Sequence, residues 1–139
     1  MNQKTYTSVR EVMTPSPHVI DGLASVSDAI AQMRTKQVSS LVVDRRHDGD
    51  EYGIVVVQDI AEKVIGMDQS PDRTSVYQIM SKPVLAVDCE MDIRYAIRLL
   101  VRFGLSRSLV TEGGKLIGIV TMRDMVFRYL PHGEVEATQ

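Results

Sequence analysis

Residues 118–124 read GIVTMRD, and a near copy, GIVVVQD, occupies residues 53–59. Each stretch begins with an apolar β-branched run, which favours a strand, and continues into residues that favour the start of a helix. One small chain therefore makes the same strand-to-helix transition twice. The copies differ at one informative position, where the second has Thr121 and the first has Val56.

The rest of the chain repeats in the same order. The two halves align over four pairs of segments, the first three at an offset of 67 residues and the last at 65: 12–21 with 79–88, 26–33 with 93–100, 38–43 with 105–110, and 52–60 with 117–125. Ten aligned positions are identical, and in the first half they are Met13, Asp21, Ala29, Ile30, Ser39, Val43, Gly53, Ile54, Val55 and Asp59. The change of offset falls in the polar segment 44–51, DRRHDGDE, where a loop absorbs a length difference.

Each half predicts an amphipathic helix with a capping residue. Ser25 and Asp92 precede the two helical segments, where their side-chain oxygens can accept backbone N–H groups of the first turn. The apolar residues that follow have i, i+3, i+4, i+7 spacing, which gives one buried stripe per helix. These residues are Val26, Ala29, Ile30 and Met33 in the first half, and Ile93, Ala96, Ile97, Leu100 and Val101 in the second.

Two strands and a second helix follow in each half. The expected strands are 40–43, 53–57, 108–111 and 116–120, and the expected helices are 59–65 and 124–130. The sequence therefore predicts an α/β (α+β) fold of two β-α-β-β-α repeats, which are too small to bury a core singly and should pack about a pseudo-twofold axis. We expect repeat 1 over residues 1–65, a linker over 66–75, repeat 2 over 76–130, and a disordered tail over 131–139.

Composition narrows the class of protein. The chain has 139 residues, 44% of them hydrophobic, a net charge of −2 and a pI near 5.9, which disfavours a nucleic-acid binder. Its single cysteine, Cys89, provides neither a disulfide nor a thiolate metal site. No apolar run approaches the roughly 20 residues of a membrane span, and the N-terminal residues do not resemble a secretion signal, so we expect a cytoplasmic protein.

The residues that could support catalysis are scattered. His18, His47 and His132 lie in unrelated settings without a metal-ligand spacing, and Cys89 is most simply a small buried residue. The loop 44–51 is read as a solvated hairpin tip in preference to a divalent-ion site. We therefore expect no catalytic residue and no metal site.

The T-x-x-D pattern of Thr121 and Asp124 has two interpretations. In the first it is a capping box, with Thr121 as N-cap and Asp124 reaching back to the helix start. In the second, the helix start faces a phosphate while the carboxylate accepts two hydroxyl protons from a ribose. Because Asp59 is retained beside Val56, which cannot cap, the sequence suggests that the aspartate has a purpose other than capping.

The doubled arrangement over roughly residues 9–130 resembles the cystathionine β-synthase (CBS) domain, as a tandem pair or Bateman module. The matching features are the VMT and IMS starts, the amphipathic helices, the VSSLVV and LSRSLV strands, and the G-I-V-x-x-x-D endings. The chain departs from the family where proline is frequent, at Leu41 and Ser108, and it departs at Val56. The resemblance implies binding of AMP, ADP or ATP, or of S-adenosylmethionine or NAD, in two clefts between the repeats.

The resemblance also implies the residues of each cleft. In the first, Asp124 would hold the ribose and Thr121 would approach the phosphate, and the same site would include Thr14, His18, Val38, Ser39, Ser40 and Arg123. In the second, Asp59 would combine with Leu105, Ser106 and Arg107, whose guanidinium offers a fork for phosphate oxygens.

The leading hypothesis is a non-enzymatic, energy-sensing regulatory module with no obligatory cofactor, which signals through a conformational shift to a target protein. The alternative is a ligand-independent dimerisation or scaffold module with vestigial clefts. The resemblance further implies a homodimer that packs through the second helices, and the expected face consists of Ile60, Val64, Met125, Val126 and Tyr129.

Overall fold

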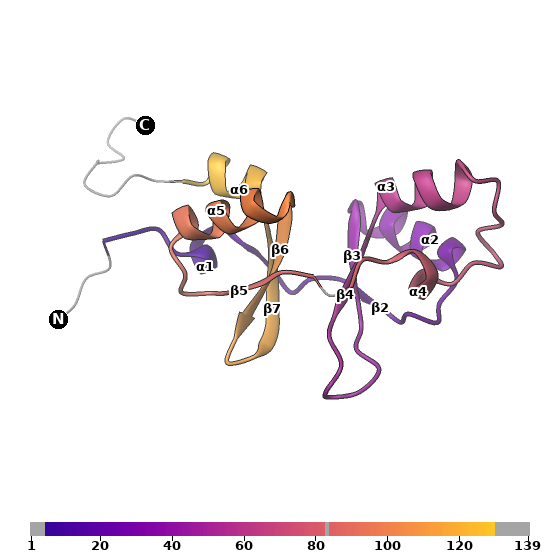
Figure 1. Ribbon diagram of the computed structural model, residues 1–139, viewed down its shortest axis with the longest axis horizontal. Helices are drawn as coiled ribbons and strands as arrows, with labels where there is room; N and C mark the ends of the chain where they lie inside the picture. The colour runs from indigo at the N-terminus through magenta and orange to yellow at the C-terminus, as the bar shows by residue number, and fades with distance from the viewer. Residues whose placement is uncertain (1–4, 83, 130–139) are drawn as a thin grey trace. The chain divides into compact units, whose positions relative to one another are not determined.

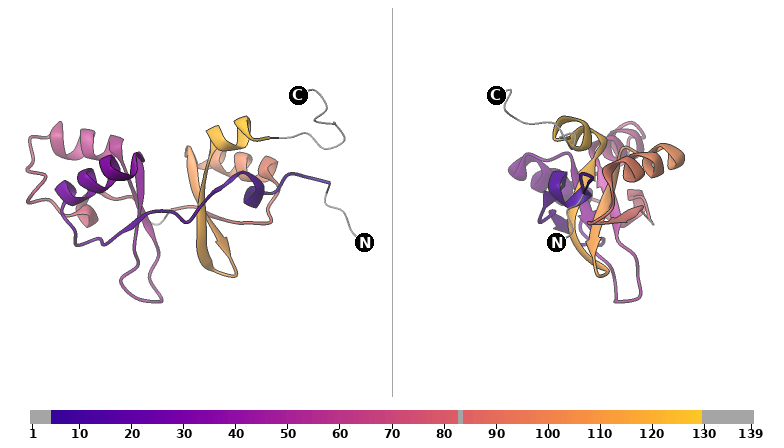
Figure 2. Two further views of the ribbon diagram at one scale, coloured as in Figure 1. Left: turned by 180° about the vertical axis from the view of Figure 1, so that it is seen from behind. Right: turned by 90° about the vertical axis from the view of Figure 1, so that its left-hand side faces the viewer.

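The computed structural model describes residues 5–82 and 84–129, and the chain divides into two compact units. Unit 1 contains residues 1–16 and 85–139, and unit 2 contains residues 17–84. Within each unit a small sheet carries its helices on one face (Figures 1 and 2). The predicted α/β class is confirmed. The expectation for residues 131–139 lies outside the described residues.

Unit 2 has a three-stranded sheet of order β2-β3-β4, in which β2 and β3 are parallel and β4 is antiparallel to β3. Its elements are β2 (Val19–Ile20), α2 (Val26–Lys36), β3 (Ser40–Val43), β4 (Gly53–Val56), α3 (Val57–Ile60), the π-helix η1 (Ala61–Ile65) and α4 (Val76–Ile79). The predicted helix and strands of the first repeat are therefore present. Its second helix begins two residues before the expected start at Asp59.

Unit 1 has a four-stranded sheet of order β1-β7-β6-β5, in which β5 and β6 are parallel and the other neighbours antiparallel. Its elements are α1 (Val9–Val12), β1 (Thr14–Pro15), β5 (Ala86–Asp88), α5 (Ile93–Phe103), β6 (Arg107–Glu112), β7 (Lys115–Thr121) and α6 (Met122–Phe127). The two β-α-β-β-α sets are thus recognisable in the structure. The short helices α1 and α4 were not predicted.

The leading segment of each repeat belongs to the unit of the other repeat. Thr14 in β1 pairs with Ile119 in β7, and the equivalent Ser81 forms a bridge with Ile54 in β4. The compact units therefore cut across the sequence repeats. The periodicity of the sequence reveals the repeats, but it does not reveal this exchange.

The glycine that begins each copy of the repeated phrase allows the leading segment to approach. A Cβ atom at Gly118 would lie 2.8 Å from the carbonyl oxygen of Thr14 and 2.6 Å from Sδ of Met13. A Cβ at Gly53 would lie 2.7 Å from Sδ of Met80. Because real Cβ contacts are longer, any larger residue would force β7 or β4 away from the neighbouring segment.

The segment expected to be a linker, residues 66–75, packs on the start of α2. The N–H of Val26 donates to the carbonyl oxygen of Thr74 at 2.8 Å, and the N–H of Ser27 donates to that of Pro71 at 3.1 Å. Two of the free N–H groups at this helix start therefore find partners in the segment. It forms an ordered part of unit 2.

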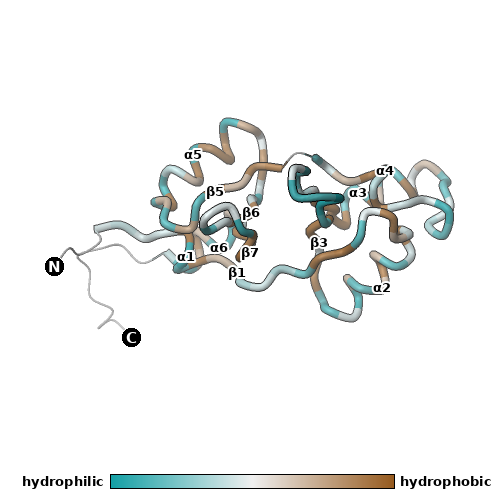
Figure 3. The backbone as a smooth tube through the Cα atoms, turned by 90° about the horizontal axis from the view of Figure 1, so that it is seen from below, coloured by the Kyte–Doolittle hydropathy of each residue, from teal (hydrophilic) through white to brown (hydrophobic). Residues whose placement is uncertain are grey.

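Each unit has its own apolar core, formed by the inner faces of its helices and strands. Helices α2 and α5 alternate between hydrophobic and hydrophilic stretches along their length (Figure 3), as the spacing predicts.

The expected dimer face is wrong in three of its members, because Ile60, Val64 and Met125 are at most 4% exposed and belong to these cores. Val126 and Tyr129 are exposed.

The predicted N-caps of the long helices are confirmed. Ser25 Oγ accepts the N–H of Asp28 at 3.0 Å, and Asp92 Oδ1 accepts the N–H of Arg94 at 2.9 Å. Asp92 is 8% exposed and forms an ion pair with the Arg94 guanidinium at 2.6 Å. Hydrogen bonding from Arg94 lowers the pKa of Asp92, although burial acts in the opposite direction.

We expect Asp92→Ala to lower the free energy of unfolding by about 1 kcal/mol at pH 7, because an N-cap is lost. The folded-state pKa of Asp92 lies below its unfolded value, so its contribution is present above the unfolded pKa and is lost as the pH falls through the folded pKa. Urea unfolding of both proteins at pH 7 and at decreasing acidic pH measures this. A difference that stays constant with pH would contradict the role of the charge.

Candidate functional site

The start of α6 is a complete capping box. Thr121 Oγ1 accepts the N–H of Asp124 at 3.0 Å, and Asp124 Oδ2 accepts the N–H of Thr121 at 3.4 Å. The structural interpretation of the T-x-x-D pattern is therefore confirmed. The capping box leaves hydrogen-bonding capacity unused, because the Thr121 hydroxyl acts in it as an acceptor and can still donate its proton. Among the residues that the structure describes, Asp124 Oδ1 has only a distant ion pair with Arg128 at 3.9 Å.

The start of α3 retains half of this arrangement. Asp59 Oδ2 accepts the N–H of Val56 at 3.0 Å, although Val56 has no oxygen with which to reciprocate. Asp59 therefore has a capping role without a hydroxyl partner, so capping can account for its retention, and a further purpose stays a prediction. Its other oxygen lies 3.3 Å from Nζ of Lys63. This carboxylate is more fully engaged than that of Asp124.

Polar side chains gather on one face of the sheet in unit 1. Arg107 pairs with Thr121 across β6 and β7, and Thr14 pairs with Ile119 across β1 and β7. Because directly opposed residues share a face and side chains alternate along a strand, Arg107, Thr121 and Thr14 project from the same face. The opposite face carries Val120, which is buried in the core.

Arg107 is half-buried, and no carboxylate of the described residues forms an ion pair with it. A partly desolvated guanidinium without an acidic partner is suited to an oxyanion, to which it can donate two parallel hydrogen bonds. It stands beside Thr121 on the sheet. Unit 1 therefore combines a guanidinium, a hydroxyl and a carboxylate at the start of one helix.

Each helix start lies against the polar strand of its own repeat. The N–H of Met122 donates to the carbonyl oxygen of Ser106 at 2.9 Å, and the N–H of Val57 donates to that of Ser39 at 3.0 Å. Leu105, Ser106 and Arg107 thus share unit 1 with Asp124, while Val38, Ser39 and Ser40 share unit 2 with Asp59. The two units are described separately, so the expected combination of residues across the repeats stays a prediction.

The remaining candidate residues of the predicted clefts differ in the unit to which they belong and in the contacts that they make. Thr14 belongs to unit 1 and His18 to unit 2, where the His18 carbonyl oxygen accepts the N–H of Val42 at 2.9 Å. Val38 packs against the core of unit 2. Exposed Arg123 lies over the Phe127 ring, with its guanidinium carbon 4.7 Å from the ring centroid. Val38 therefore has a packing role that accounts for its apolar character.

Ser108, where the resembling family often has proline, is accommodated without an unsatisfied group. Its side chain is buried, and its hydroxyl lies 2.9 Å from the carbonyl oxygen of Leu85.

The sequence did not predict that Thr14 pairs directly with strand β7 and so joins the polar face of unit 1. The available signal was the pair of glycines, Gly53 and Gly118, which permit this approach.

Over the described ranges, 5–82 and 84–129, no group of three or more histidine, cysteine, aspartate or glutamate side chains could hold a metal ion. Cys89 is buried, and burial raises the pKa of its thiol. A search of this same part of the chain finds no helix with the length and apolarity needed to cross a bilayer.

Comparison with known proteins gives a family and several relatives. The model of the CBS domain matches residues 9–66 and 76–130. An uncharacterised protein of Methanopyrus kandleri is 34% identical over 118 residues, which cover 84% of this chain and 57% of the relative. A 33.4 kDa protein of Thermofilum pendens is 31% identical over 138 residues, covering 91% of this chain and 45% of the relative. The chain spans about half the length of these relatives.

Solved structures share the fold. A hexameric CBS-CP12 protein from bloom-forming cyanobacteria has a TM-score of 0.86 and 35% identity, covering 91% of this chain and 70% of its own. A conserved CBS-domain protein of Thermoplasma acidophilum has a TM-score of 0.79 and 27% identity, covering 90% and 70%. A CBS-domain protein of Pyrobaculum aerophilum, complexed with AMP, has a TM-score of 0.75 and 16% identity, covering 87% and 92%.

Proposed function

Because this chain belongs to the CBS-domain family and contains a tandem pair of CBS domains, we propose that it is a non-catalytic regulatory module for an adenosine-containing ligand. The ligand is AMP, ADP or ATP, with S-adenosylmethionine and NAD as further candidates, and both repeats contribute to its cleft. In this proposal the ligand favours one arrangement of the module, and a target protein responds to that arrangement.

The observation that carries the proposal is that three polar side chains of unit 1, those of Asp124, Thr121 and Arg107, lie at the start of α6 or beside it on the sheet. Asp124 retains a carboxylate oxygen that can accept ribose hydroxyls, and Thr121 retains a hydroxyl proton that it can donate to a phosphate oxygen. Arg107, on the same sheet face, supplies a positive charge without an ion-pair partner among the described residues. Sugar, phosphate and charge are the features that a nucleoside monophosphate presents.

A structural relative supports the choice of ligand. The Pyrobaculum aerophilum protein, which has the same fold, was solved as a complex with AMP. We propose AMP as the first ligand to test, and we propose that the Asp124 site binds it more tightly than the Asp59 site. The reason is that Lys63 already neutralises Asp59, and Val56 offers no hydroxyl.

Regulation requires a ligand that distinguishes two arrangements of the module. A ligand with equal affinity for both arrangements does not change the equilibrium between them. A tenfold higher affinity for one arrangement changes their free-energy difference by about 1.4 kcal/mol. We propose that the bound nucleotide supplies this preference by contacting both repeats. The target protein then recognises a surface that changes with it.

A thermal-shift panel of AMP, ADP, ATP, NAD and S-adenosylmethionine tests the proposal. We expect at least one of them to raise the melting temperature, since a ligand at about 100 times its dissociation constant adds about 2.7 kcal/mol of stability. Adenosine without a phosphate is the control, and its effect should be smaller. Unchanged melting temperatures with every nucleotide at millimolar concentration would remove the regulatory proposal.

One observation favours the alternative, a ligand-independent scaffold. Unit 2 has an apolar groove of about 390 Å³ between α2 and the α3–η1 segment, lined by Ile30, Val38, Val57 and Ile65 among others. Apolar surface of this kind is typical of protein–protein contacts. If no nucleotide binds while the chain forms a stable dimer in solution, the scaffold function takes the place of the regulatory one.

A further inference from the structure

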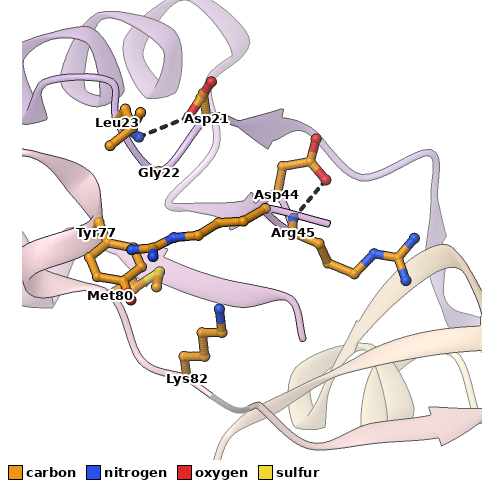
Figure 4. A pocket seen from close by; sticks show the side chains of 9 residues that line it. Asp21, Gly22, Leu23, Asp44, Arg45, Tyr77, Met80 and Lys82 are labelled. Carbon is orange, nitrogen blue, oxygen red and sulfur yellow. Dashed lines mark hydrogen bonds between the residues drawn. The ribbon is translucent and has the colours of Figure 1, made fainter. Parts of the chain in front are cut away.

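Unit 2 contains a pocket of about 480 Å³ at the end of its sheet that is remote from Asp59 (Figure 4). In the β3–β4 pair, the register runs from Ser40 opposite Val56 to Val43 opposite Gly53. Asp59 follows the first of these ends, whereas the pocket lies beyond the second. Its size suits a small metabolite.

Arg46 of the β3–β4 loop brings positive charge to this pocket, whereas the guanidinium of the neighbouring Arg45 points away from Tyr77 (Figure 4) and donates to the carbonyl oxygen of Asp48 at 3.1 Å. The Arg46 guanidinium carbon lies 3.7 Å from the centroid of the Tyr77 ring, and that of Arg45 lies 4.9 Å from the centroid of Tyr52. Stacking fixes the plane of a guanidinium but leaves the N–H groups at its edge able to donate. Neither arginine forms an ion pair with a carboxylate of the described residues.

The loop that carries these arginines is braced in place. Asp50 accepts the N–H of Arg46 at 3.0 Å and forms an ion pair with Nζ of Lys82 at 2.6 Å. The hydrogen bond from Lys82 lowers the pKa of Asp50 well below its usual range, so Asp50 is ionised at neutral pH. The loop is mostly exposed and joins antiparallel strands, as expected for a solvated hairpin tip, and it also has internal hydrogen bonds.

Two carboxylates also line the pocket. Asp21 follows β2 and accepts the N–H of Leu23 at 2.8 Å, and Asp44 follows β3 and accepts the N–H of Arg45 at 2.8 Å. Each hydrogen bond uses one carboxylate oxygen. Within the described part of the chain, no hydrogen bond is given to the other oxygen of either residue, so both can accept hydroxyl protons.

At the equivalent end of the sheet in unit 1, a cation is paired with acidic side chains. Arg10 stands where the alignment places Tyr77, and its guanidinium contacts Glu90 at 3.3 Å and Glu112 at 2.5 Å. The cation there is neutralised by two acids. Unit 2 instead has Tyr77 at this position and two extra residues in the loop that contains Arg46.

We propose that this pocket binds a small phosphate monoester that carries hydroxyl groups, such as a sugar phosphate. Arg46 has a positive charge without an acidic partner among the described residues, which suits the phosphate group of such a monoester. Asp21 and Asp44 accept the hydroxyl groups of the same molecule. The site is separate from that of Asp124, because all of these residues belong to unit 2.

Calorimetric titration with glucose 6-phosphate tests this proposal, with glucose and inorganic phosphate as reference probes. We expect saturable binding of glucose 6-phosphate, weaker binding of inorganic phosphate and none of glucose. Arg46→Ala should weaken binding about tenfold or more, because it removes a charged donor pair. Arg46 is exposed, so its truncation opens no core cavity, and circular dichroism verifies the fold.

Arg73→Ala is the matched control, because it removes the same charge from an exposed position of unit 2 that does not line the pocket. We expect it to leave the affinity unchanged, and we expect Asp124→Asn to do the same. Absence of saturable binding, or equal losses in Arg46→Ala and Arg73→Ala, would overturn the proposal. Equal affinity for inorganic phosphate and glucose 6-phosphate would overturn the role of Asp21 and Asp44.

Discussion

Replacement of Asp124 by asparagine is expected to weaken AMP binding by a factor of about 10 to 100 while the protein stays folded. The hydrogen bonds of a ribose to a carboxylate are worth about 1.5–3 kcal/mol because the acceptor is charged. Asparagine keeps an oxygen that can accept the Thr121 N–H, so the hydrogen bond from residue 124 back to the N-cap residue is preserved. Calorimetric titration of AMP into both proteins gives the ratio of dissociation constants.

Asp59→Asn provides the matched control for this substitution, because Asp59 occupies the equivalent position and caps Val56 in the same way. We expect it to reduce AMP affinity less than Asp124→Asn does. Equal AMP affinity in wild type and Asp124→Asn, with both proteins folded, would leave Asp124 with the capping role alone. The regulatory site would then have to be sought elsewhere.

Leu100→Ala is expected to lower the free energy of unfolding by about 3 kcal/mol, which corresponds to a fall in melting temperature of roughly 10 °C. Leu100 lies in α5 and is fully buried in the core of unit 1. Truncation removes apolar burial and leaves a cavity, because the surrounding side chains relax only in part. Differential scanning calorimetry measures the change in melting temperature.

Val101→Ala is the control for this prediction, since the neighbouring side chain in α5 is 64% exposed. We expect a change of about 0.5 kcal/mol or less, as is usual for surface substitutions. If the two substitutions destabilise the protein equally, the assignment of the buried face of α5 is incorrect.

The elements of this fold were predictable because local signals agreed with one another. The helical spacing of residues 26–33 and 93–100 and the caps at Ser25 and Asp92 recur in the structure. Val101, which was expected in the buried stripe of α5, is 64% exposed, so that part of the prediction was wrong. The resemblance to a tandem CBS pair is likewise confirmed by the family match. What the sequence did not reveal is the exchange of leading segments, because pairing of Thr14 with Ile119 depends on contacts between residues far apart in the chain.

The candidate site was predictable in its residue types and less so in its grouping. Thr121 and Asp124 were identified from their spacing, and the structure gives them the expected capping geometry. Arg107 was assigned to the site of Asp59, and this grouping across the repeats stays a prediction, while its strand pair with Thr121 places it in the unit of Asp124. Residues three or four positions apart on one helix are fixed by local geometry, whereas cross-strand neighbours depend on register.

Asp59, the aspartate retained in the first repeat, shows a further limit of prediction from sequence. Because Val56 cannot cap, the sequence suggested a purpose other than capping for Asp59, yet the Asp59 carboxylate accepts the Val56 N–H, which every residue except proline possesses. A backbone donor is invisible in a comparison of side chains. The sequence argument therefore overestimated what the loss of one hydroxyl implies.

The most direct test of the central claim is a nuclear magnetic resonance titration of the labelled protein with AMP, in which backbone amide shifts report the position of the ligand. The account predicts saturable shifts at residues 121–124 and at Arg107, and their loss in Asp124→Asn. Shifts confined to the pocket of Arg46 and Tyr77, or no shifts at millimolar AMP, would contradict it.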